Sequence, residues 1–505
     1  MPKPISFGKI DVSLTSDMEE TKSAPEEETP FRIVILGDFT GRTNRGIFNP
    51  GLAGRKPIFV DKDNIDELPA RLNVEINLSI LGKDSAPITI KFAEMDDFHP
   101  DRLYEKLDAF EALHDMRQSM KDPETFASLI KEEIPPPSPV ASSEKKEEAP
   151  ELGSLLDVIL DESEDRKIGD KPYPEQPEMQ RFLKEITQPH LVPKIHPKQA
   201  EMIATVDEAS GELMRRILHH PDFQAVESLW RGLYFLVSRL DTDEKLKIYL
   251  LDISKEELAA DLSSAEELSK TGTYKILVEH TIKMFGGEPW AVIVGNYRFN
   301  QGINDIVLLG RMAKIAWAAG APFISSASDT VLGCESVAKC PDPDEWKETE
   351  ENRVWDALRK IPEASYLGLA LPRFLLRLPY GRDTVPVESL PFQEMPEQPV
   401  HEQYLWGNSS FACTYLLAQS FIEEGWGFQQ GQVMDIEGMP LHVYKEQGES
   451  VAKPCAEVVL TEEAAEKILD KGLLLLLSYR NQDVIRLARF QSLADPPANL
   501  SGRWG

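Results

Sequence analysis

Hydrophobic and polar residues alternate in two adjacent stretches near the start of the chain. Every second position from 72 to 80 is apolar, and the alternation resumes at 88–92 after a Gly-Lys-Asp-Ser turn. The alternating residues are Leu72, Val74, Ile76, Leu78, Ile80, Ile88, Ile90 and Phe92. A period of two is typical of strands with one buried face, so this pattern predicts a β-hairpin. A short apolar run at 31–36 predicts a strand before it.

Other stretches have apolar residues at every third or fourth position, which is the period of an amphipathic helix. One begins at Pro100, a residue favoured in the first helical turn, and ends near residue 121. Further helices are expected over residues 153–163, 202–217 and 223–236. Ser254 and Glu257 have the spacing of a capping box, which predicts another helix start.

Strand-like and helical stretches alternate in the second half of the chain. The expected strands cover 246–251, 290–295, 322–327 and 366–371, and the expected helices about 303–319 and 344–360. Right-handed crossovers place such strands in a parallel or mixed sheet covered by helices. The apolar run Leu473–Leu477 predicts one more buried strand. The predicted fold class is α/β, or mixed α+β, with mixed sheets flanked by helices.

A charged, proline-rich segment divides the chain. Residues 131–151 hold five prolines, three serines and nine charges, a composition that cannot recover its ordering entropy by packing. The sequence therefore predicts a small N-terminal domain and a larger, multi-part domain. We expect a strand with an acidic segment at 1–30, a small domain at 31–131, a linker at 132–152 and a large domain at 153–505.

Composition excludes some functions. The chain has 505 residues and a formal net charge of −30, which disfavours binding to nucleic acid or to an anionic membrane. Four scattered cysteines predict neither a disulfide scaffold nor a zinc site, and we expect reduced, mostly buried thiols. The first residues contain no apolar stretch of signal-peptide length, so we expect a cytoplasmic protein with no membrane span.

Three segments invite an enzymatic interpretation. Residues 34–46 place glycine-rich turns after a strand but lack the Lys-Ser/Thr pair of a phosphate loop, and Asp38 could equally cap a turn. His219 and His220 suit helix capping better than metal binding. An aromatic and arginine-rich set fits a ligand cleft, or more commonly a core or interface: Tyr404, Trp406, Trp426, Phe428, Arg373 and Arg377. The sequence predicts no enzyme, catalytic residue, cofactor or metal.

The first residues carry a detached strand pattern. Its apolar positions are Ile5, Phe7, Ile10, Val12 and Leu14, and an acidic segment separates them from the first domain. Such a strand can extend a sheet of another molecule by β-augmentation. It can equally fold back on its own domain as an edge strand, and the sequence leaves both alternatives open.

Several motifs in the same order resemble the contractile sheath of type VI secretion systems. Residues 31–131 resemble the small subunit, TssB (VipA), through FRIVILGDFTGR, FVDKDNIDELPARLNVEINLSI and ITIKFAEMDDFHPDRL. Residues 153–500 are similar to the large subunit, TssC (VipB), through ILHHPDFQAVESLWRGLYFLVSR, FGGEPWAVIVGNYRF, YLGLALPRFLLRLPYG and LWGNSSFA. The resemblance implies a natural fusion of the two subunits. The large-subunit match stops at ANLSGRWG, where the family normally continues with a further C-terminal region.

The resemblance also implies a function and partners. Family members assemble into a helical tube around an inner tube of Hcp on a baseplate, contract to drive that tube, and are disassembled by the ATPase ClpV. The strand at residues 5–14 matches the place of the strand exchanged between neighbours. The helix recognised by ClpV corresponds to Leu155, Leu156, Val158 and Ile159. The alternatives are a non-polymerising baseplate or terminal adaptor, and a nucleotide hydrolase.

Overall fold

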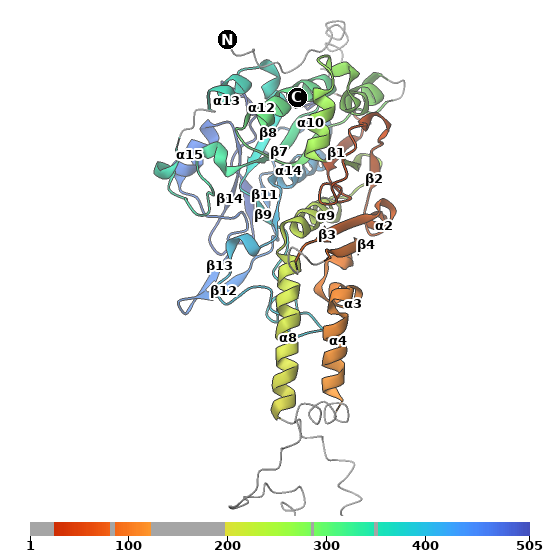
Figure 1. The fold of residues 1–505 in the computed structure, drawn as a ribbon. Coiled ribbons are helices and arrows are strands. Elements are labelled where there is room, and N and C mark those ends of the chain that lie inside the picture. The colour runs from red at the N-terminus through yellow and green to blue at the C-terminus, as the bar shows by residue number, and fades with distance from the viewer. Residues whose placement is uncertain (1–24, 81–85, 123–196, 284–286, 348–351, 505) are drawn as a thin grey trace, which may run out of the picture. The chain divides into compact units, whose positions relative to one another are not determined.

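The computed structural model describes residues 25–80, 86–122, 197–283, 287–347 and 352–504 (Figure 1). The chain divides into two compact units, one formed by the residues up to Glu111 and from Ala209 onward, the other by Ala112–Glu208. The expected exchange strand, the expected linker and the helix expected at 153–163 lie outside the described residues. The domain boundaries that depend on them stay a prediction.

The larger unit is built on a mixed sheet of nine strands among the described residues, in the order β11-β15-β14-β8-β7-β6-β1-β5-β2. These strands are β1 (Phe31–Gly37), β2 (Ile58–Val60), β5 (Leu246–Asp252), β6 (Val292–Phe299), β7 (Phe323–Ala327), β8 (Leu367–Leu371), β11 (Asp435–Ile436), β14 (Leu474–Ser478) and β15 (Ile485–Leu487).

Strand β1 occupies an interior position of this sheet. It pairs in parallel with β5, placing Phe31 opposite Leu246, and with β6, placing Ile33 opposite Val292. Except for Arg32, all its residues are buried, as expected for a strand covered on both faces. A strand from the first tenth of the sequence thus lies between two strands more than 200 residues further along the chain.

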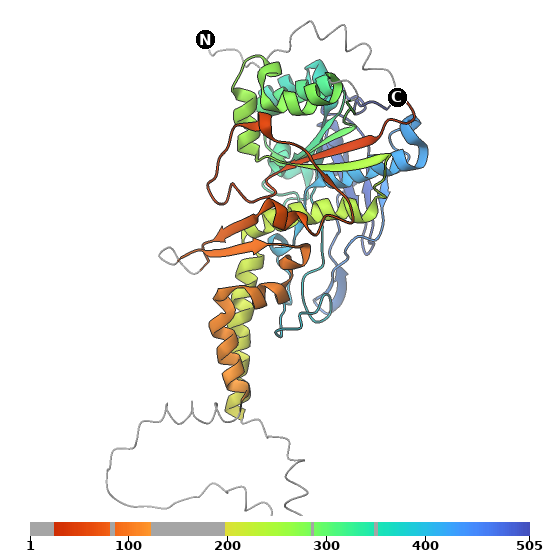
Figure 2. The same ribbon diagram turned by 90° about the vertical axis from the view of Figure 1, so that its right-hand side faces the viewer.

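Helices cover both faces of the sheet (Figure 2). Contacts from α12 (Ile303–Ala319) and α14 (Ser409–Glu424) both reach β6, β7 and β8. The other α-helices described in this unit are α2 (Leu68–Leu72), α3 (Pro100–Lys106), α9 (Pro221–Arg239), α10 (Lys255–Ser263), α11 (Gly272–Tyr274), α13 (Asn352–Arg359) and α15 (Glu462–Asp470). A π-helix at Lys275–Lys283 follows α11. Helices α4 (Asp108–Lys121) and α8 (Pro197–Leu218) each cross the boundary between the two units.

In the part of the chain that the structure describes, three small sheets accompany the large one. The predicted hairpin is confirmed as β3 (Val74–Leu78) and β4 (Ile88–Phe92), which pair antiparallel with Val74 opposite Phe92. The others are β9 (Phe374–Leu375) with β10 (Trp406–Gly407), and β12 (Val443–Glu446) with β13 (Glu449–Ala452).

Most elements expected from periodicity are confirmed. The series β6, β7 and β8 is parallel, α12 has the predicted bounds, and β14 pairs in parallel with β8. In the capping box, Ser254 Oγ accepts the amide of Glu257 at 3.2 Å, and a Glu257 oxygen accepts the amide of Ser254 at 3.1 Å.

Two helices differ from the prediction. The helix expected from Pro100 to residue 121 is interrupted at Leu107, whose backbone is extended (φ −92°, ψ 123°) and separates α3 from α4. The helix expected over 344–360 is shorter: α13 covers Asn352–Arg359, after a single 3-10 turn at Pro343–Glu345.

In the smaller unit, the outer turns of α4 and α8 lie side by side (Figures 1 and 2). Met120 and Val206 are buried between them. Arg117 Nε lies 2.6 Å from Asp207 Oδ1, and Gln199 Nε2 donates to the carbonyl of Met120 at 2.6 Å. An apolar contact flanked by polar ones fixes how these two segments meet.

Replacing Trp230 with Ala is expected to lower the free energy of unfolding by about 3–5 kcal/mol. Trp230 is fully buried, and its Nε1 donates to the carbonyl of Phe39 at 3.0 Å, so the change creates a cavity and removes a hydrogen bond. Urea denaturation measures the loss. Tyr234→Ala, on the same helix but 46% exposed, is the matched control and should change stability much less. Equal effects of the two substitutions would contradict the packing described.

Candidate functional site

The loop that follows β1 is closed by a carboxylate. Asp38 accepts the amide of Arg42 at 3.0 Å and the amide of Thr43 at 2.8 Å, one with each oxygen. These are amides that a bound phosphate would need. Of the two roles considered for Asp38, the structure has it capping the turn, and this geometry does not favour a phosphate loop.

The same loop carries two arginines into a buried ionic cluster. Arg42 contacts Asp252 at the end of β5, and its Nη2 lies 2.9 Å from Glu257 Oε2. Arg55 donates to both carboxylate oxygens of Glu257 through Nη1 and Nη2, at 2.7 and 2.9 Å. We call Arg42, Arg55, Asp252 and Glu257 the seam cluster, because it joins the segment around β1 to β5 and α10.

Hydrogen bonds from two arginines keep Glu257 charged. Burial by itself raises the pKa of Glu257, but hydrogen bonds from Arg55 and Arg42 outweigh burial and lower this pKa to about 2. The side chain of Glu257 is 1% exposed. Removing one partner from a buried ion pair typically costs about 3–5 kcal/mol, because the other charge is left uncompensated. The seam cluster therefore makes the position of the β1 segment specific.

A second buried ionic cluster surrounds Arg377. Its Nε donates to Glu227 at 2.8 Å, and its Nη1 donates to Glu394 at 2.7 Å. Arg231 also donates to Glu227, at 2.7 Å. Burial raises the pKa of Glu394, but the charge of Arg377 and hydrogen bonds lower it overall to about 2. Each of the two buried carboxylates is thus matched by an arginine, an arrangement that fixes the loop after β9 against α9.

The two adjacent histidines have different partners. His220 Nδ1 accepts the amide of Asp222 at 3.2 Å and so caps the N-terminus of α9. His219 Nε2 lies 3.6 Å from Glu394 Oε1. The sequence favoured capping, but at the C-terminus of the preceding helix; His220 caps the following helix instead. No group of three or more His, Cys, Asp or Glu side chains in the described ranges is placed to hold a metal ion.

The aromatic residues singled out from the sequence lie in the core. Tyr404 and Trp406 pack together with ring centroids 5.6 Å apart. Trp426 and Phe428 instead surround Phe31 of β1, at 5.4 and 6.3 Å. All four are at most 7% exposed, which supports the core interpretation over a ligand cleft. The two arginines of the set serve separate ionic contacts, Arg377 with Glu227 and Glu394, and Arg373 with Glu457.

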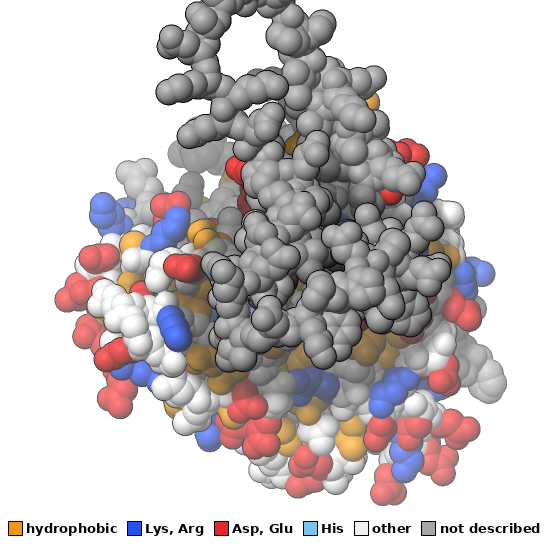
Figure 3. Space-filling view, turned by 90° about the horizontal axis from the view of Figure 1, so that it is seen from below, with side chains coloured by type: hydrophobic (Ala, Val, Ile, Leu, Met, Phe, Trp, Pro, Cys, Tyr) orange, Lys and Arg blue, Asp and Glu red, His pale blue; other side chains and the backbone are white. Residues whose placement is uncertain are grey.

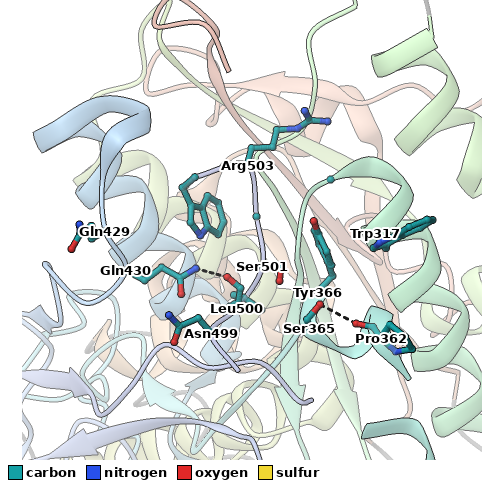
Figure 4. A pocket seen from close by; sticks show the side chains of 13 residues that line it. Trp317, Pro362, Ser365, Tyr366, Gln429, Gln430, Asn499, Leu500, Ser501 and Arg503 are labelled. Carbon is teal, nitrogen blue, oxygen red and sulfur yellow. Dashed lines mark hydrogen bonds between the residues drawn. The ribbon is translucent and has the colours of Figure 1, made fainter. Parts of the chain in front are cut away.

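A cavity of about 800 Å³ is lined in part by residues 499–504 (Figure 4). Trp317, Tyr366, Gln430 and Arg503 are among its lining residues. Arg503 donates to the carbonyl of Ala319 at 2.7 Å. The lining offers amides, hydroxyls and aromatic rings, but neither carboxylate, histidine nor cysteine. The hydroxyls of Ser365, Ser501 and Tyr366 have no carboxylate or histidine in this lining to act as a general base, and burial raises the pKa of Tyr366.

The edges of the described sheets offer few positions where a partner could add a strand. The large sheet ends in the short strands β2 and β11, which blunts strand addition there. The outer edge of β3 is covered by Asn44, which hydrogen-bonds the amide and carbonyl of Asn77 at 2.7 and 3.0 Å. Strand β4 has no second partner strand among the described residues. Acidic, basic and hydrophobic side chains are interspersed on the face drawn in Figure 3.

Two of the predicted sites cannot be placed. The strand-exchange residues (Ile5, Phe7, Ile10, Val12 and Leu14) and the ATPase-recognition residues (Leu155, Leu156, Val158 and Ile159) lie outside the described residues. Among the described cysteines, Cys413 and Cys455 are buried, Cys334 and Cys340 are half-buried, and all are free thiols. Over the stretches of chain that the structure describes, no helix has both the length and the apolarity for a membrane span.

Comparison with known proteins finds secretion sheath proteins that are similar to two ranges of this chain. The sequence model of VipB, tail sheath N-terminal domain, matches residues 200–494, and that of the type VI secretion system protein VipA matches residues 8–128. The type VI secretion system sheath protein TssC1 of Pseudomonas aeruginosa is 37% identical over 306 residues, which cover 58% of this chain. The match spans 61% of that relative's length.

The fold and the seam cluster indicate a structural protein, in which strand β1 of the VipA-matched segment lies in the same sheet as the strands of the VipB-matched segment. Because the VipB match covers more than half of the chain, the chain belongs to the VipB tail sheath family of type VI secretion systems, and it carries a VipA segment in the same polypeptide. The resemblance found in the sequence is confirmed.

Replacing Glu257 with Gln is expected to lower the free energy of unfolding at pH 7 by about 3 kcal/mol, since one pKa unit corresponds to about 1.4 kcal/mol. The pKa of Glu257 falls from 4.5 to about 2 on folding, so its stabilisation is complete above pH 4.5 and disappears as the pH falls towards 2. Denaturation curves at several pH values measure this convergence of mutant and wild type.

The matched control is Glu256→Gln, an exposed neighbour on α10. It should change stability by less than about 1 kcal/mol. A Glu257→Gln chain as stable as this control at pH 7 would show that the seam cluster does not hold the β1 segment.

Proposed function

We propose that this chain is a structural protomer of the type VI secretion sheath, which assembles into a tube around the inner Hcp tube and drives it by contraction. The observation that carries the proposal is the presence of both sheath segments in one chain, with the VipA-matched strand β1 between VipB-matched strands β5 and β6. Each protomer thus contains one VipA-matched and one VipB-matched segment, which fixes their ratio at one to one. It performs no bond chemistry in this role.

Fusion has a physical consequence for assembly. A covalent link replaces the encounter of two subunits with an intramolecular step, which raises the effective concentration of each for the other. The seam cluster then holds the joined segments in one register. We infer that free energy for contraction is stored in contacts between protomers, because the contacts inside each protomer are buried and charge-matched.

The proposed partners follow from the family. They are further copies of the chain, the inner Hcp tube, baseplate components and the ATPase ClpV, which would recognise the segment around Leu155–Ile159. We propose that the strand at residues 5–14 joins a neighbouring copy by β-augmentation, in the cytoplasm and without nucleic acid or membrane insertion. The outer edge of β4 offers a strand position that no other described strand occupies.

Electron microscopy of the purified full-length chain tests this function. Mixed with Hcp and baseplate proteins, the chain should form tubes or rings, with a label on it distributed along their length. A label confined to one end would support the terminal adaptor instead. A chain that stays monomeric with all these components present would contradict both structural functions, and steady ATP or GTP turnover would support the hydrolase alternative.

Deleting residues 1–15 is expected to abolish assembly and leave the fold intact, because these residues precede the described core. Thermal unfolding should give the same melting temperature as the full chain, while sedimentation shows monomers only. A second variant replaces Ile10, Val12 and Leu14 with Ser, which keeps the length of the chain, removes the apolar alternation and should also abolish assembly. Tubes of normal length from either variant would refute the linking role of the strand.

A further inference from the structure

A lysine amine faces a histidine near the β12–β13 hairpin. Lys453 directly follows β13, and its amide donates to the carbonyl of His442 at 2.8 Å, which fixes its backbone. Its Nζ lies 2.8 Å from Nδ1 of His401. This pair lies outside both the seam cluster and the cluster around Arg377, and the proposed sheath role does not use it.

The other nitrogen of His401 faces a buried carboxylate. His401 Nε2 lies 3.1 Å from Glu457 Oε1, and Arg373 holds Glu457 through its Nε at 2.9 Å and its amide at 2.7 Å. Burial raises the pKa of Glu457, but hydrogen bonds from His401 and Arg373 bring it down to about 2. Glu457 is therefore ionised and accepts a hydrogen bond from Nε2–H, which leaves the lone pair of Nδ1 pointing at Lys453.

Aromatic rings hold this group in place. His401 lies against Trp406 with ring centroids 4.9 Å apart, and Trp406 Nε1 donates to the carbonyl of His401 at 2.8 Å. Lys453 Nζ lies 5.5 Å from the Tyr404 ring and 5.7 Å from the Trp406 ring. Burial lowers the pKa of Lys453, against the opposing effect of Glu457 and Glu402. A neutral amine is the nucleophilic form of lysine.

A cavity of about 610 Å³ opens beside the amine. Lys453, His401 and Glu457 line it, and so do the exposed cations Lys339 and Arg480. Tyr444 and Glu449 are the further titratable side chains of its lining. Two exposed cations beside a nucleophile suit a substrate with an anionic handle and an electrophilic end.

We propose that Lys453 is an acylation site, at which the amine takes an acyl group from a thioester with a phosphorylated carrier. The amine nitrogen attacks the thioester carbonyl, the new C–N bond forms as the C–S bond breaks, and the thiolate leaves. One amine proton passes to His401 Nδ1 and from there to the thiolate. Glu457 and Arg373 act as positioning residues for His401. Acylation converts the amine of Lys453 into an amide that can no longer be protonated, and the acyl group fills some of the cavity.

The test incubates the full-length chain with acetyl-coenzyme A at pH 7.5, with no other enzyme, and follows each lysine by peptide mass spectrometry. Acetylation of Lys453 should be at least about tenfold faster than that of Lys445, an exposed lysine on the same hairpin. Unfolding in urea should make the two rates equal. Equal rates in the folded chain would overturn the proposal.

Two variants separate the roles of the neighbours. His401→Gln should slow Lys453 about tenfold or more and leave Lys445 unchanged, because the proton acceptor is lost. Arg480→Gln should slow the reaction with acetyl-coenzyme A but not with a short uncharged acetyl thioester. An unchanged Lys453 rate in folded His401→Gln would overturn the role of His401 as proton acceptor. If Arg480→Gln slowed the reactions with the two thioesters equally, recognition of an anionic group by Arg480 would be wrong.

The pH dependence of the two acetylation rates in the unaltered chain tests the proposal without any substitution. Among the described residues, the charged and titratable groups around Lys453 are His401, Glu402, Glu457 and Tyr404. Arg373 contacts Glu457, and Lys339, Tyr444, Glu449 and Arg480 line the cavity. Acetylation of Lys453 should level off at a lower pH than that of Lys445. Coincident profiles would show an ordinary amine and end the proposal.

Discussion

Everything in the larger unit depends on the placement of β1 between β5 and β6. Its backbone hydrogen-bonds on both sides, over a seven-residue register with β5 and a four-residue register with β6. Without β1 the sheet would split in two, with unpaired edges, and its buried side chains would lose their cover. The VipA-matched segment is therefore a structural component of the VipB-matched sheet, which explains why a covalent connection between the two is compatible with the fold.

Apolar burial alone would not fix that register, because β1 is apolar at nearly every position and a slip would still bury it. The seam cluster supplies what burial lacks. Glu257 is fully buried, so its charge is tolerable only where both Arg42 and Arg55 reach it. A displaced β1 would carry these arginines away and leave a buried, unpaired carboxylate. The cluster around Arg377 applies the same constraint to the loop after β9.

Sequence reasoning succeeded where the signal is local. The hairpin, the capping box at Ser254 and the parallel series β6–β8 follow from patterns within a few dozen residues. It could not place β1 beside β5, because nothing local encodes a partner more than 200 residues away. It expected no interruption at Leu107, since apolar periodicity continues through that position. The group of Lys453, His401 and Glu457 escaped notice because His401 lies 52 and 56 residues away from the other two in the sequence, and only the fold brings it to them.

Charge sets a condition on the proposed assembly. The formal net charge is −30, and the two buried clusters pair their own carboxylates internally, so the excess negative charge is left to the rest of the chain. Copies of such a chain repel one another over about 10 Å at moderate salt. Attraction between copies must then come from contacts that are insensitive to net charge, namely shared backbone hydrogen bonds and buried apolar side chains. The apolar alternation at residues 5–14, next to an acidic segment, suits that condition, because the strand proposed there can pair while the neighbouring charges stay in solvent.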